Sequence, residues 1–102
     1  MLESYRDLTD EQLIAALKNS GDPDGKIMDY ILDKYKPLVR KKANAVFLIG
    51  GETDDLIQEG MIGLFKAVRD YEKDRDASFS TFADLCISRQ IYTAVAVSYT
   101  HL

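Results

Sequence analysis

The sequence is short of the residues on which catalytic, metal-binding and disulfide-stabilised proteins depend. Its 102 residues include one cysteine, Cys86, and one histidine, His101. A single cysteine allows no internal disulfide, which fits a reducing compartment, and in an apolar stretch it is expected to pack in the core. His101 has no base, nucleophile or metal ligand near it in the sequence. We therefore expect no enzyme and no metal site.

Segments that direct a protein to a membrane are also missing. No apolar run approaches the ~20 residues needed to span a bilayer, and the start, MLESYRDLTDEQ, lacks the basic and apolar regions of a signal peptide. Seventeen acids against thirteen bases give a net charge of −4. This balance argues against a protein that coats nucleic acid by charge alone. We expect a cytoplasmic protein with no membrane partner, whose contacts with nucleic acid are local.

The residues that are present suit one helical domain. A chain of this size buries about two-thirds of its unfolded surface, enough for one core. Residues 26–47 hold six bases and two acids, whereas residues 48–78 hold four bases and eight acids. Apolar residues recur at helical spacing, without strand alternation or an internal repeat. The sequence therefore predicts an all-α fold, a compact bundle of three to four helices.

Capping residues predict the first helix. In LTDEQL, Thr9 can bond the backbone of Gln12 while Gln12 reaches back, which is a capping box. Gly21 then ends the helix, so the lead-in segment covers residues 1–21.

The second helix is predicted over residues 22–49. Asp22 should cap it, and Pro23 should take its first position. Pro37 should kink or divide it, and Gly50 should follow its end.

Two more helices complete the predicted bundle. One covers residues 53–71 with Thr53 as its cap, and Gly60 within it gives room to a packed neighbour. After the charged loop EKDRDAS, the last helix covers residues 78–96. Residues 97–102 form a tail.

One residue of the helix over residues 53–71 faces away from the core. At 100° per residue, Ile62 falls in the middle of the polar side. A surface that mixes acids, an amide and apolar side chains suits a basic, partly apolar partner helix. Its members are Asp55, Gln58, Glu59, Met61, Ile62 and Phe65. The plainer alternative is a solvated face with one exposed isoleucine, and periodicity alone favours that alternative.

A second surface lies on the last helix. Leu85, Arg89 and Tyr92 fall outside its apolar half, at spacings of four and three. An arginine beside an aromatic ring can contact phosphate and bases, although an ordinary surface has the same pattern. Three polar or aromatic side chains precede this helix: Tyr71, Glu72 and Arg75.

Together these stretches resemble a known family. The segment DLIQEGMIGLFKAVRDYEKDRDASFSTFADLCISRQI closely resembles region 2 of bacterial sigma factors of the sigma-70 family, the promoter-recognition subunits of RNA polymerase. The similarity has no gap from about Thr53 to Ala96. YILDKYKPLVRKKANAVFLIG resembles the preceding part of that region, and LTDEQLIAALKNSGD resembles its lead-in. Within the family, the chain is most similar to the alternative sigma-H type, which is associated with stationary phase and sporulation.

The resemblance implies two partners and no cofactor. Family members dock on the clamp coiled coil of the beta-prime subunit of core RNA polymerase, and they recognise and melt the minus-ten element of promoter DNA. The surface around Ile62 would then bind the clamp. A flipped base needs stacking and polar edge contacts. The resemblance assigns stacking to Tyr71 and Phe82, polar contacts to Glu72 and Arg75, and readout of the upstream duplex to Arg89 with Tyr92. Leu85 belongs to the same DNA-binding set. Phe79 would pack inside the fold.

The chain departs from the family pattern at several positions. Leu85 and Cys86 stand where principal sigma factors have two tryptophans, and Ala77 replaces a loop aromatic, so weaker strand separation is expected. The segment VSYTHL has none of the basic residues with which the family continues, and we expect it to be a truncation scar or foreign sequence outside the fold. A complete member would add a domain for the minus-thirty-five element.

Two further hypotheses concern partners. An anti-sigma factor would be an additional protein partner of such a chain. A hypothesis from another class is a helical interaction or adaptor domain, which binds RNA polymerase or another protein without reading DNA.

Overall fold

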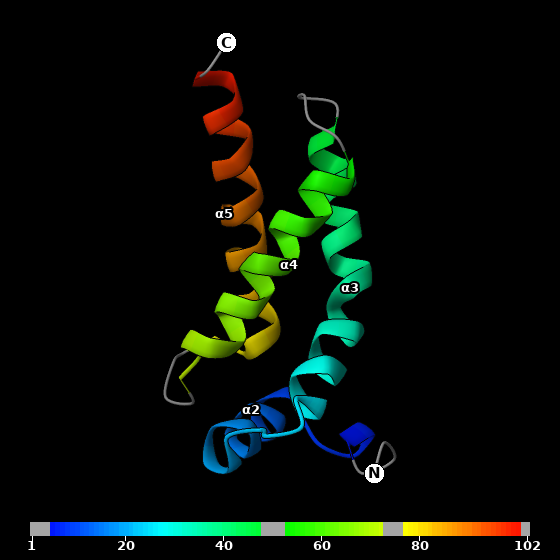
Figure 1. Cartoon of the computed structure of the whole chain (residues 1–102), viewed down its shortest axis with the longest axis vertical. Helices are drawn as coiled ribbons and strands as arrows, with labels where there is room; N and C mark the ends of the chain where they lie inside the picture. Colours follow the sequence, from blue (N-terminus) through cyan, green and yellow to red (C-terminus); the bar gives the residue numbers. More distant parts are fainter. Residues whose placement is uncertain (1–4, 48–52, 73–76, 101–102) are drawn as a thin grey trace.

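The structure is a computed structural model that describes residues 5–47, 53–72 and 77–100, and these residues form an all-α fold (Figure 1). The helices are α2 (Asp10–Ser20), α3 (Lys26–Phe47), α4 (Thr53–Asp70) and α5 (Phe79–Thr100). No strand occurs within the described ranges. The predicted helical bundle is confirmed.

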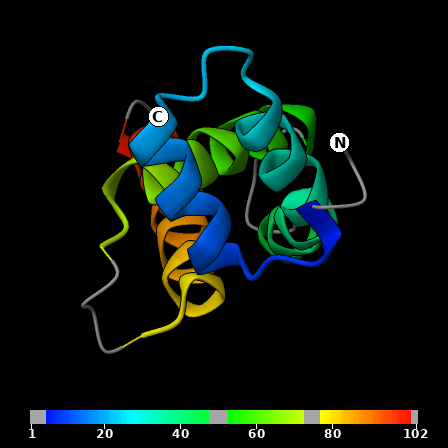
Figure 2. The same ribbon diagram turned by 90° about the horizontal axis from the view of Figure 1, so that it is seen from below.

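Helix α4 lies at the centre of the bundle. Figure 1 shows α3 and α5 as two long helices with α4 crossing between them, and Figure 2 shows α2 lying across one end. All four helices contribute apolar side chains to one core. The largest side chains that are fully buried are Leu13, Ile31, Val39, Leu64, Val68, Phe79, Ile87 and Ile91.

Two glycines let α4 approach its neighbours closely. A Cβ atom on Gly60 would stand 2.6 Å from Cγ1 of Val39 in α3 and 3.2 Å from Cδ1 of Ile91 in α5. A Cβ atom on Gly63 would meet the backbone of α5. The prediction that Gly60 gives room to a packed neighbour is confirmed.

The capping box at the start of α2 is confirmed. The backbone N–H of Gln12 donates to Oγ1 of Thr9 at 3.1 Å, and the N–H of Thr9 donates to Oε1 of Gln12 at 2.8 Å. Gly21 takes the left-handed conformation with φ 77°, and its N–H donates to the carbonyl of Leu17. The predicted stop is therefore also confirmed, one residue beyond Ser20.

The start of α3 differs from the prediction. The helix begins directly after Gly25, so the expectation that Pro23 takes its first position is wrong. Gly25 has φ 71°, a left-handed conformation that a continuous α-helix cannot include. Asp22 is nevertheless the cap, because Oδ1 accepts from the N–H of Ile27 at 3.1 Å and Oδ2 from that of Met28 at 3.0 Å.

Other boundaries shift by smaller amounts. Helix α3 runs undivided through Pro37, and Gly50 lies outside the described residues. Thr53, expected as a cap, is the first helical residue of α4. Helix α5 extends beyond Ala96 to Thr100, so the expectation that the whole tail lies outside the fold is wrong for residues 97–100. The remaining two residues of the tail are outside the described part.

Candidate docking and nucleic-acid surfaces

The outward face of α4 displays two large apolar side chains. Ile62 is 45% exposed and Phe65 is 47% exposed, while the stripe that includes Leu64 is buried in the core. Asp55 and Gln58 are exposed on the same outward face. The structure therefore brings together the acid, the amide and the apolar residues that the sequence grouped. We call this surface, with Glu59 and Met61, the α4 docking face.

A hydrogen-bonded bridge fixes one edge of the α4 docking face. Nε2 of Gln90 in α5 donates to Oε1 of Glu59 at 2.9 Å, and Nζ of Lys66 donates to Oε1 of Gln90 at 3.2 Å. Glu59 is partly buried as a result. The sequence did not indicate this contact, because the residues come from separate helices.

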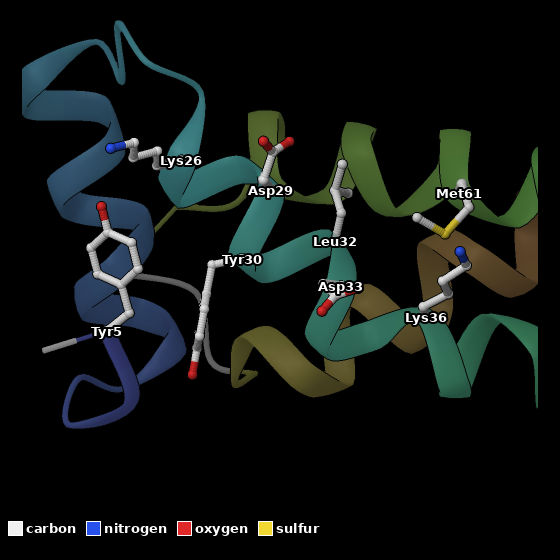
Figure 3. A pocket seen from close by; sticks show the side chains of 8 residues that line it. All are labelled: Tyr5, Lys26, Asp29, Tyr30, Leu32, Asp33, Lys36 and Met61. Carbon is white, nitrogen blue, oxygen red and sulfur yellow. The ribbon is translucent and has the colours of Figure 1, made fainter. Parts of the chain in front are cut away.

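Met61 lies at the other edge, beside a groove (Figure 3). The cavity has a volume of about 690 Å³ and is lined by Tyr5, Lys26, Asp29, Tyr30, Leu32, Asp33, Lys36 and Met61. The rings of Tyr5 and Tyr30 meet edge to face at 5.5 Å. No sequence signal pointed to this groove, since it joins α3 to Tyr5 and to one side chain of α4, which lie far apart in the sequence. It extends the α4 docking face onto α3.

The exposed face predicted for α5 is confirmed in its geometry. Leu85 is 46% exposed, Tyr92 is 55% exposed, and Arg89 between them is also exposed. Phe82, one turn before Leu85, is partly buried. These four residues form what we call the α5 face. Glu72 is exposed at the end of α4, and Arg75 lies outside the described residues.

Tyr71 is buried, which differs from what its predicted stacking role requires. The residue is 4% exposed. Its ring lies 5.5 Å from the ring of Phe79 and 5.7 Å from that of Phe82, and its hydroxyl donates to the carbonyl of Ala77 at 3.1 Å. A base can stack only on a free ring face, and these neighbours cover Tyr71. Phe79 is fully buried, as predicted.

A second groove runs beside the α5 face. It has a volume of about 480 Å³ and is lined by Leu38, Ser80, Thr81, Asp84, Leu85 and Ser88. Nζ of Lys42 in α3 lies 2.8 Å from Oδ1 of Asp84 in α5, so an ion pair joins the two helices here. Of the lining residues, Leu85 alone was predicted to belong to a binding surface. The segment FSTFA contains two of the others, Ser80 and Thr81.

Asp10 at the start of α2 accepts hydrogen bonds from two side chains of α3. Its carboxylate accepts from Nζ of Lys34 at 2.7 Å and from the hydroxyl of Tyr35. The hydrogen bond to Asp10 raises the pKa of Lys34. Burial, followed by the hydrogen bond to Asp10, raises the pKa of Tyr35. Both groups therefore keep their protons more tightly than they would in water, and their hydrogen bonds to Asp10 join α3 to α2.

Within the described ranges, no group of three or more histidine, cysteine, aspartate or glutamate side chains could hold a metal ion. None of the helices described there combines the length and the apolar composition that crossing a bilayer requires.

The described helices form an all-α domain with two exposed surfaces. One surface mixes apolar and acidic groups, and the other combines aromatic side chains with an arginine. Residues 31–97 match the family model described as Sigma-70 region 2. The chain belongs to the sigma-70 family of RNA polymerase sigma factors.

Relatives with known names agree with this assignment. The chain is 48% identical over 93 residues to the RNA polymerase sigma-H factor of Bacillus subtilis (strain 168), covering 91% of this chain and 41% of that protein. The sigma-H factor of Bacillus licheniformis is also 48% identical over 93 residues, with 91% and 40% covered. The sigma-F factor of Bacillus licheniformis is 37% identical over 76 residues, with 74% and 30% covered.

The chain thus spans about two fifths of the length of the sigma-H relatives. No solved structure matches it.

Proposed function

We propose that this chain acts as region 2 of a promoter-recognition subunit of bacterial RNA polymerase of the sigma-H kind. It directs transcription initiation by docking on the beta-prime clamp coiled coil and by recognising and melting the minus-ten element. The polymerase performs the chemistry, so the chain is a regulatory subunit rather than an enzyme, and it works in the cytoplasm. Family membership over residues 31–97 and the two exposed surfaces support this proposal.

The α4 docking face supports the polymerase contact. Exposed Ile62 and Phe65 supply apolar area that a partner helix can bury. Burial of such area stabilises a complex. Asp55, Gln58 and Glu59 supply charge and hydrogen bonds that orient a basic partner. The groove beside Met61 offers a further recess for a side chain of the same partner. This combination is the observation that carries the docking proposal.

The α5 face supports the DNA contact. Phe82 and Tyr92 offer ring surface for stacking, Leu85 offers apolar contact, and Arg89 offers hydrogen-bond donors to phosphate or base edges. The ring of Tyr71 packs against Phe82 from the core side at an interplanar angle of 50° and supports that ring, instead of meeting the base directly. Glu72 and Arg75 remain proposed polar contacts.

Fluorescence anisotropy of a labelled, single-stranded non-template minus-ten oligonucleotide tests the proposal. The oligonucleotide is titrated with core polymerase, with and without the chain, at one fixed salt concentration because phosphate contacts depend on salt. Sequence-selective binding that requires the chain is the expected result. Binding of the chain to core polymerase without any selective DNA binding would instead support the adaptor hypothesis. No binding to the polymerase would contradict the proposed function and would leave only an adaptor for another protein.

A further inference from the structure

Helix α2 binds both ends of the segment that connects α4 to α5. Nζ of Lys18 donates to the carbonyl oxygen of Tyr71, directly after α4. Oε2 of Glu11 accepts from the backbone N–H of Phe79, the first residue of α5, at 2.8 Å and 68 residues away in the chain. Figure 2 shows α2 lying across this end of the bundle. Two side chains of one short helix therefore hold the two helix ends that flank the connection.

The charges of these side chains match the helix ends that they hold. The C-terminal end of a helix carries carbonyl groups without helical partners and a partial negative charge, which favours the ammonium group of Lys18. The N-terminal end carries free N–H groups and a partial positive charge, which favours the carboxylate of Glu11. Helix α2 thus supplies a tertiary cap to α4 and another to α5.

A row of aromatic rings connects these caps to the α5 face. The ring of Phe79 meets the ring of Tyr35 at 5.5 Å and that of Tyr71 at 5.5 Å, both edge to face. Tyr71 in turn meets Phe82 at 5.7 Å. Asp10, next to Glu11, accepts from the hydroxyl of Tyr35, so α2 holds this row at the ring of Tyr35 and at the backbone of Phe79.

We propose that Glu11 and Lys18 are positioning residues for base capture. Glu11 caps α5 and holds Phe79 in place, and Lys18 caps α4 and holds Tyr71 in place. These two rings set the orientation of the Phe82 ring. Neither side chain needs to touch DNA. Since Phe82 is partly buried and rests on Tyr71, a shift of either helix end moves the ring that a base would meet. This inference rests on the proposed DNA function of the α5 face.

Three variants that each lose one negative charge test the role of Glu11. Glu11→Ala removes the acceptor, Glu11→Gln keeps an oxygen that can accept from the N–H of Phe79, and Asp7→Ala removes an exposed carboxylate outside α2. Their equal charge cancels any general electrostatic effect on DNA binding. Lys18→Met, with exposed Lys41→Met as its charge-matched control, tests the other cap.

Three measurements follow for each variant: anisotropy with the minus-ten oligonucleotide and core polymerase, binding to core polymerase alone, and the NMR signals of the Phe79 amide and the Phe82 ring. Thermal melting followed by circular dichroism confirms that each variant is folded at the temperature used. Glu11→Ala and Lys18→Met are expected to weaken oligonucleotide binding about fivefold to tenfold, to shift the Phe82 signals and to leave polymerase binding unchanged. Glu11→Gln should resemble the wild type.

The inference and the proposed function can fail separately. If the wild type binds the oligonucleotide and Glu11→Ala binds it as well as Asp7→Ala does, the positioning role is wrong. If the wild type fails to bind, the proposed DNA function is wrong, and the NMR signals still decide the inference. Unchanged Phe82 signals in Glu11→Ala would overturn the inference, because the inference states that Glu11 sets the orientation of the Phe82 ring.

Discussion

Gly63 of α4 lies directly against the backbone of Cys86 in α5. A Cβ atom built on Gly63 would stand 2.7 Å from the carbonyl oxygen of Cys86, 2.9 Å from Cβ of Gln90 and 3.0 Å from Cα of Ile87. Those are backbone atoms and the first side-chain atom of a packed helix, so they cannot turn aside. The close crossing of α4 and α5 therefore requires a glycine at position 63, which has no side chain. The same crossing places Gln90 within hydrogen-bonding distance of Glu59.

Gly63→Ala should destabilise the fold. Alanine favours a helix over glycine by about 1 kcal/mol, yet the added methyl group must push α5 away, and overpacking of this kind costs about 1–3 kcal/mol. Gly60→Ala should cost less, because its new methyl group would meet only side-chain atoms, Cγ1 of Val39 at 2.6 Å and Cδ1 of Ile91 at 3.2 Å, and not the backbone of a packed helix. Urea unfolding of both variants measures the difference, and a Gly63→Ala protein as stable as the wild type would contradict it.

Asp22→Ala should lower the free energy of unfolding by about 1 kcal/mol, the usual cost of losing a helix cap. Both carboxylate oxygens accept backbone N–H groups of α3, and alanine offers neither oxygen. The residue also has φ 47°, a conformation that asparagine tolerates better than alanine does. Asp22→Asn, which retains one acceptor oxygen, is the matched control in thermal melting. Equal losses for Ala and Asn would argue against the capping role.

Tyr35 should make stability fall at high pH. Its folded pKa is raised above the ordinary value of 10.0, by burial first and by the hydrogen bond to Asp10 second. This contribution is fully present below pH 10.0. It declines above that value, because the unfolded chain then releases the proton more readily than the folded one.

Tyr35→Phe should be less stable at neutral pH, since it loses the bond to Asp10, and should lose less stability between about pH 9 and pH 11. Urea unfolding at several pH values measures both effects. Tyr92→Phe, which removes the hydroxyl of an exposed tyrosine, serves as the control. If the free energy of unfolding of Tyr35→Phe falls with pH as steeply as that of the wild type, the raised pKa of Tyr35 does not cause the loss of stability.

Ile62→Ser and Leu85→Ser form a matched pair, because the two side chains are almost equally exposed, at 45% and 46%. Ile62→Ser should weaken binding to core polymerase by about 1–2 kcal/mol, as expected when an apolar contact in an interface is truncated, while its melting temperature stays close to that of the wild type. Leu85→Ser should leave polymerase binding unchanged and weaken binding of the minus-ten oligonucleotide. Pull-down and anisotropy measure the two activities, and equal loss of both in either variant would show that the two surfaces are not separate sites.

Local sequence patterns predicted much of this fold. The capping box at Thr9 and the stop at Gly21 depend on residues three or four positions apart, so neighbouring side chains decide them. The 3.6-residue period identified the buried stripe of α4 and, by exclusion, the exposed position of Ile62. The same reasoning gave Leu85, Arg89 and Tyr92 one face of α5. Local patterns predicted the wrong start for α3, because the residues next to Gly25 do not indicate its left-handed conformation.

Other features depend on contacts between distant segments. Nothing near Glu11 in the sequence indicates that it caps a helix 68 residues later, and nothing near Tyr71 indicates that Phe79 and Phe82 cover its ring. The sequence by itself determined which faces of the helices are apolar, because periodicity is a local property. The tertiary structure alone decided which ring is buried, which acid caps which helix and where the grooves lie, because these follow from how the helices cross and from the atoms that the crossing brings together.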